Sequence, residues 1–81
     1  MQPVVRNEKQ LAVALRRFRK AQNMTQGDLA VRANRRQATI SNLENGSSTL
    51  ETLFAALSAL ELEIIVQPRS HSRAPDIGDI F

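Results

Sequence analysis

The chain has 81 residues, of which 42% are hydrophobic, and its net charge is +3 at neutral pH. This length corresponds to one small domain, which buries only about 60% of its unfolded surface, so we expect a partner subunit to add stability. The sequence has no cysteine, no signal peptide and no apolar run near about 18 residues, which argues against disulfides, secretion and membrane insertion. A soluble cytoplasmic protein is therefore expected.

Charge is distributed unevenly along the chain. Residues 1–36 carry nine basic and two acidic side chains, whereas residues 37–67 carry four acidic side chains and no basic one. A basic half of this kind attracts the phosphate backbone of nucleic acids, but it can equally be a solvated helix face.

The first predicted helix begins after Asn7, a good N-cap residue, and runs to about Gln22. Its buried face is expected to hold Leu11, Leu15 and Phe18. Cations near its end interact favourably with the helix dipole, which gives a structural explanation for part of the basic run Arg16, Arg17, Arg19 and Lys20. Phosphate contact by some of them stays open.

The second predicted helix runs from about Gln26 to Ala33. Thr25 can cap it, with Asp28 three residues on completing a capping box, and Met24 with Leu29 forms a hydrophobic staple across the cap. Its buried face should hold Leu29, Ala30 and Ala33. Asn34 follows, a residue type that tolerates the left-handed conformation in which many helices end.

The third predicted helix runs from Gln37 to Asn45 and is followed by Gly46 as its C′ residue. Ile40 and Leu43 are spaced to be buried, which leaves small polar side chains facing away: Gln37, Ala38, Ser41 and Asn42. Such a face suits the major groove, where Gln pairs with adenine and an Ala methyl meets a thymine methyl. The spacing alone fits an ordinary amphipathic helix pair equally well.

Arg36 occupies the N-cap of this third helix, where Ser or Asp would be worth about 1 kcal/mol more. A guanidinium at this position can reach guanine or a phosphate, and a solvated side chain is the alternative.

The fourth predicted helix begins after Thr49 and runs from Leu50 to about Leu60, with a core stripe of Leu50, Leu53, Phe54, Leu57 and Leu60. Residues 61–66 then change to an alternating pattern, which predicts a strand. A lone strand needs a partner for its backbone, so we expect it to pair with its copy in a homodimer through Leu62, Ile64 and Val66. Continuation of the fourth helix is the alternative.

The combination Thr25-Gln26-x-x-Leu29-Ala30 followed by Gln37-Ala38-Thr39-Ile40-Ser41-x-Leu43-Glu44-Asn45-Gly46 resembles the phage-repressor and Cro class of DNA-binding domains. The resemblance narrows to HipB-like antitoxins over residues 7–67. It implies a mainly α domain of four to five helices with a C-terminal strand, which binds operator DNA as a homodimer and also binds a HipA-type serine/threonine kinase toxin. The expected DNA contacts are Gln26, Arg35, Arg36, Gln37, Ala38, Thr39, Ser41, Asn42 and Asn45.

Residues 68–81 are rich in Pro, Ser, Arg and Gly and are expected to form a flexible tail that cannot support a core. Its end nevertheless carries apolar side chains, which suggests burial by a partner. By the resemblance, an aromatic near the C-terminus can dock on the toxin, and Phe81 is the counterpart here. The apolar side chains Ile77 and Ile80 are expected to be buried with it.

No enzyme active site is expected, because the only histidine, His71, lies in this tail without a rigid base or orienting carboxylate nearby. One His and no Cys cannot make a usual zinc site, and no glycine-rich phosphate loop is present, so no metal or cofactor is expected. Two alternatives to a DNA-binding antitoxin remain: a free-standing repressor of the phage class and a small helical adaptor that binds protein only.

Overall fold

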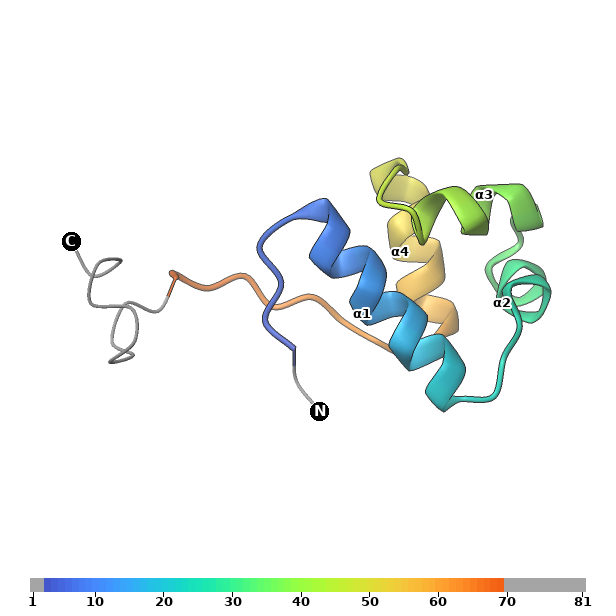
Figure 1. The fold of residues 1–81 in the computed structure, drawn as a ribbon, viewed down its shortest axis with the longest axis horizontal. Helices are drawn as coiled ribbons and strands as arrows, with labels where there is room; N and C mark the ends of the chain where they lie inside the picture. The colour runs from blue at the N-terminus through green and yellow to red at the C-terminus, as the bar shows by residue number, and fades with distance from the viewer. Residues whose placement is uncertain (1–2, 70–81) are drawn as a thin grey trace.

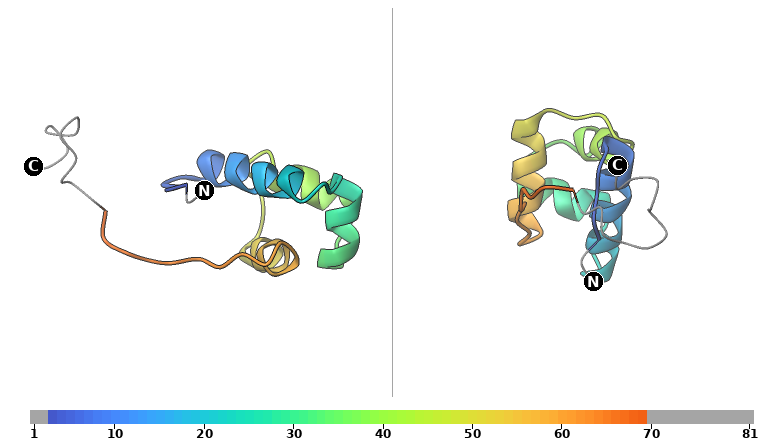
Figure 2. Two further views of the ribbon diagram at one scale, coloured as in Figure 1. Left: turned by 90° about the horizontal axis from the view of Figure 1, so that it is seen from below. Right: turned by 90° about the vertical axis from the view of Figure 1, so that its left-hand side faces the viewer.

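The computed structural model describes residues 3–69, which form four α-helices: α1 (Glu8–Ala21), α2 (Gln26–Ala33), α3 (Gln37–Leu43) and α4 (Leu50–Ala59) (Figure 1). The helix α2 packs against α3 and α4, and α3 also contacts α4. In Figure 2, α1 and α4 lie in two layers and α2 stands across one end of the pair. In this part of the chain no helix is long and apolar enough to cross a membrane.

One hydrophobic core joins all four helices. Its largest fully buried side chains are Leu15 of α1, Leu29 of α2, Ile40 of α3 and Leu60 at the end of α4. Full burial of a side chain of this size contributes about 1.5–3 kcal/mol. The inward faces predicted for α2 and α3 are thereby confirmed.

The predicted N-caps are confirmed as well. The side-chain oxygens of Asn7, Thr25 and Thr49 each accept a hydrogen bond from the backbone N–H three residues on. At α2 the capping box is complete, because Thr25 N donates to Asp28 Oδ2 at 2.9 Å and Asp28 N donates to Thr25 Oγ1 at 3.0 Å. Each cap satisfies a backbone N–H that has no partner inside its helix.

The end of α3 differs from the prediction. The helix ends at Leu43, not Asn45. Gly46 follows with φ +91°, the left-handed conformation that was predicted for the residue closing this helix. The amides of Asn45 and Gly46 donate to carbonyls three residues back, at Asn42 and Leu43. Such bonds form a tighter turn than an α-helix, so the last two predicted helical residues belong to this turn.

The buried stripe of α4 also differs from the prediction. Leu50 and Phe54 were expected in the core, but they are 73% and 54% exposed. Thr52 and Ala56 are buried beside Leu53, Leu57 and Leu60. The inward face of α4 is therefore rotated toward its small side chains, which leaves Leu50 and Phe54 outside.

After α4 the chain turns at Glu61, whose φ of 58° is left-handed. Leu62 then packs against the core, and its N–H donates to Leu57 O at 2.8 Å. This turn rules out continuation of the fourth helix. Residues 3–69 contain no strand: beyond Leu62 the chain leaves the helical body as a single segment with no backbone partner (Figure 1).

Candidate nucleic-acid interface

The helices α2 and α3 are joined by a turn with fixed geometry. Asn34 adopts the left-handed conformation, with φ 57° and ψ 49°, as its residue type predicted. Its N–H donates to Val31 O at 3.1 Å, and the N–H of Arg35 donates to Ala30 O at 2.8 Å. These bonds satisfy carbonyls at the end of α2, so the direction in which α3 leaves α2 is set by the backbone.

Three of the four side chains that were predicted to face outward from α3 are exposed, and the fourth, Ser41, is half-buried. Ile40 and Leu43 are buried in the core, whereas Thr39 and Ser41 are half-buried at the edges of the helix. The exposed residues of α3 and its following turn are Gln37, Ala38, Asn42 and Asn45. A helix with a small, polar and uncharged outer face can approach base edges closely.

Gln37 lies over the first turn of α2. A Cβ placed on Gly27 would be 3.7 Å from Gln37 Oε1, which is ordinary van der Waals contact. The N-terminal ends of α2 and α3 are therefore close together. Arg36, the N-cap of α3, is exposed, and its side chain makes no capping hydrogen bond, as predicted.

A buried ion pair holds the far end of α3, and sequence reasoning missed it. Arg19 of α1 donates from Nε to Glu44 Oε2 at 2.6 Å and from a second guanidinium nitrogen to Glu44 Oε1 at 3.0 Å. It also donates to Met24 O at 2.8 Å. The two charged side chains are only 8% and 4% exposed. The signal in the sequence was weak, since the partners lie 25 residues apart.

Gln26, a predicted DNA contact, belongs to the same cluster. Its Nε2 donates to Glu44 Oε1 at 3.1 Å, so the side chain is partly occupied in linking α2 to the end of α3. Arg35, another predicted contact, folds back in a similar way. Its guanidinium donates to Asn34 O at 3.0 Å and lies 3.9 Å from a Glu51 carboxylate oxygen.

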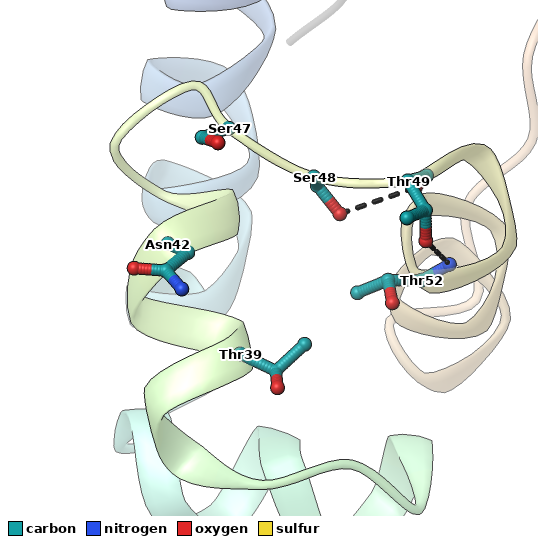
Figure 3. A pocket seen from close by; sticks show the side chains of 6 residues that line it. All are labelled: Thr39, Asn42, Ser47, Ser48, Thr49 and Thr52. Atoms are coloured by element: carbon teal, nitrogen blue, oxygen red, sulfur yellow. Dashed lines mark hydrogen bonds between the residues drawn. The ribbon is translucent and has the colours of Figure 1, made fainter.

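Two open hollows flank α3. One, of about 530 Å³, is lined by Asn34, Arg35, Arg36 and Thr39. The other, of about 380 Å³, lies between α3 and the start of α4 and is lined by Thr39, Asn42, Ser47, Ser48, Thr49 and Thr52 (Figure 3). Hydroxyls and amides of this kind are phosphate-binding donors. Within residues 3–69, no cluster of three or more His, Cys, Asp or Glu side chains could hold a metal ion.

The pKa of one carboxyl at the start of α2 is perturbed. The backbone N–H and then the hydroxyl of Thr25 hydrogen-bond to Asp28 and lower its pKa below the usual value of 3.8. The carboxylate thus stays ionised at the positive end of the helix dipole.

The sequence predicted one interface for dimerisation and one for the toxin, and only the residues of the first lie within the described part of the chain. Leu62 is half-buried against its own core, whereas Ile64 and Val66 are 43% and 93% exposed. The predicted toxin contacts Ile77, Ile80 and Phe81 lie outside the described residues.

Residues 15–66 match the Helix-turn-helix family. The sequence is 44% identical over 57 residues to Antitoxin HipB of Escherichia coli strain K12. The aligned residues cover 68% of this chain and 65% of that protein. It is 42% identical to Antitoxin HipB of Escherichia coli O6:H1, covering 61% of that protein. The matches thus span less than two thirds of these curated relatives.

Similar solved structures cover more of the chain. The "HipB-O4 20mer complex" matches with a TM-score of 0.80 at 35% identity, over 85% of this chain and 100% of that chain. The "Structure of HipA-HipB-O2-O3 complex" matches with a TM-score of 0.76 at 36% identity, over 86% and 100%.

Proposed function

Because this chain belongs to the Helix-turn-helix family and is HipB-like in sequence and fold, we propose that it is an antitoxin of a type II toxin-antitoxin system. In this role it binds operator DNA as a homodimer in the cytoplasm, represses its own operon and restrains a HipA-like serine/threonine kinase toxin.

The observation that carries DNA reading is the outer face of α3. Its exposed side chains are small and polar, and both ends of the helix are held in place, by the Asn34 turn at one end and by the Arg19–Glu44 pair at the other. Preorganised polar groups of this kind, Gln and Ser among them, discriminate between bases. We therefore assign α3 as the reading helix.

Binding to two DNA duplexes tests this assignment. One duplex is selected by the wild-type protein from a randomised pool, and the other is a scrambled version of the same composition. Gln37→Ala and Ser41→Ala should each lower the preference for the selected duplex by about 1–3 kcal/mol at one base position. Ser58→Ala, an exposed serine on α4, is the matched control and should leave the preference unchanged. Equal losses on both duplexes for Gln37→Ala would place the reading surface elsewhere.

The toxin partner is proposed from a solved relative that contains HipA and HipB together and from the apolar end of the tail. Burial of Phe81 in a pocket contributes about 1.5–3 kcal/mol, less the entropy of ordering the segment. In a co-purification from the native host, Phe81→Ala should recover less of a kinase, while His71→Ala, a polar change in the same tail, should not. A chain that captures no kinase in either form would favour the alternative, a free-standing repressor.

A further inference from the structure

The rotation of α1 about its own axis is fixed by contacts on two sides. On one side Arg19 pairs with Glu44 at the end of α3, and on the other Gln22 Nε2 donates to Leu60 O at 2.9 Å, at the end of α4. Near the start of α1, a Cβ on Gly46 would lie 3.8 Å from Lys9 Cγ. These contacts show which side of α1 faces the end of α3 and the turn that follows it.

Three exposed cations follow this side of α1. An α-helix turns by about 100° per residue, so Arg16 and Lys20 lie about 60° and about 100° round from Arg19, on the side away from Gln22. Lys9 lies between them in direction, about two turns before Arg16. We call Lys9, Arg16 and Lys20 the α1 basic row. It is about 17 Å long. At its Lys9 end it lies against Gly46, in the turn that follows α3.

Arg17 differs from Arg16 only in its position around the axis of α1. It is exposed on the same helix, but it lies about 100° further round, nearly opposite the buried face of Ala12 and Leu15. Among residues 3–69, neither arginine pairs with a carboxylate, and the same holds for Lys9 and Lys20. Within the described residues, the charge of the basic row is thus not neutralised by a carboxylate.

We propose that the α1 basic row binds the phosphate backbone of the duplex that α3 reads, and that Arg17 does not. The proposal rests on the proposed DNA-binding function and deepens it, because it separates two adjacent arginines that composition cannot distinguish. The Lys9 end of the row lies against the turn that follows α3, the row has the charge that phosphate requires, and none of its members pairs with a carboxylate among residues 3–69.

The salt dependence of binding tests this proposal. The slope of log affinity against log salt concentration falls by about 0.9 for each phosphate contact that is lost. With the intact protein and both duplexes, Arg16→Gln should reduce the slope by about 0.9 per subunit, which is about 1.8 for the proposed dimer. The triple change of Lys9, Arg16 and Lys20 to Gln should reduce it by up to about 2.7 per subunit, which is about 5.4 for the dimer. Arg17→Gln, the matched control, should leave it unchanged. Affinity should fall by the same factor on both duplexes, and circular dichroism checks that each variant keeps its helices.

Equal changes in slope for Arg16→Gln and Arg17→Gln would overturn the proposal, since the effect would then be general charge attraction. An unchanged slope for the triple variant would overturn it as well. If the wild-type protein shows no preference between the duplexes, the proposed function itself fails. If the preference is present and depends on Gln37 while the slope ignores the basic row, only this inference fails.

Discussion

The Arg19–Glu44 pair links three helices through two side chains. Glu44 accepts from Arg19 of α1 and from Gln26 of α2, and it stands directly after the last residue of α3. In the interior, such a charge is tolerated only while its partner and its hydrogen bonds are present. We infer that the pair fixes the end of α3, the proposed reading helix, relative to α1 and α2.

Removing one member of this pair should be costly. Glu44→Gln leaves the Arg19 guanidinium buried without a counter-charge, which costs about 3–5 kcal/mol and is a large part of the stability of a small domain. Urea denaturation followed by circular dichroism measures the loss. The matched control is Glu51→Gln, which breaks the exposed pair with Arg35 and should cost about 0–1 kcal/mol. Similar losses for the two variants would contradict a structural role of the buried pair.

Acidification should weaken the start of α2. The pKa of Asp28 is lowered in the folded protein, so ionised Asp28 stabilises the native state at neutral pH, and this stabilisation is lost as the pH falls below about 4 through the folded pKa. Thermal melting at about pH 5 and about pH 3 should show this loss in the wild type. In Asp28→Asn the same acidification should lower the melting temperature less. A fall equal to that of the wild type would exclude Asp28 as a source of the acid sensitivity.

For single helices, the features that depend on neighbouring residues were predicted correctly from the sequence. The caps at Asn7, Thr25 and Thr49 and the left-handed Asn34 depend on residues within a few positions, and all are confirmed. The rotation of α4 depends on packing between helices, which a single periodic pattern does not contain. The prediction therefore found the helices but misplaced Leu50 and Phe54.

The uncapped start of α3 offers a test at the scale of one helix. The backbone of Arg36 has the extended conformation of an N-cap, with φ −77° and ψ 151°, but no side chain accepts from the first turn. Arg36→Asp should therefore stabilise the protein by about 1 kcal/mol in urea denaturation and at the same time weaken DNA binding. Arg36→Ala separates the two effects, because it removes the guanidinium without adding a cap. DNA affinity equal to wild type in both variants would show that this arginine is simply solvated.

In the whole molecule, the predicted strand at residues 61–66 needs a second strand for its backbone hydrogen bonds, and the described part of one chain does not supply it. Ile64, Ile65 and Val66 are exposed, and their backbone has no partner in the described chain. Pairing with a second subunit cannot form in a single chain, so the predicted strand remains a prediction. The Arg19–Glu44 pair was missed for a related reason: its partners are distant in sequence, and only the fold brings them together.

Because side chains alternate between the two faces of a strand, Ile64 and Ile65 provide a matched pair of variants. If the segment pairs across a dimer with Ile64 and Val66 facing the shared core, Ile64→Lys should weaken dimerisation and DNA binding together. Ile65→Lys places the same charge on the opposite face and should be tolerated better. Sedimentation equilibrium measures both variants. Equal dimerisation by the two would mean that the subunits associate through another surface.

We propose that two copies of this chain read one DNA site through paired α3 helices. The mass of the protein–DNA complex on the duplex selected by the wild-type protein, measured by sedimentation velocity, tests it directly. We expect two chains per duplex, an inverted repeat in the selected sequence and half-sites about one helical turn apart, as two-fold symmetry requires. A saturated complex with one chain per duplex and no repeat in the selected sequence would contradict the claim.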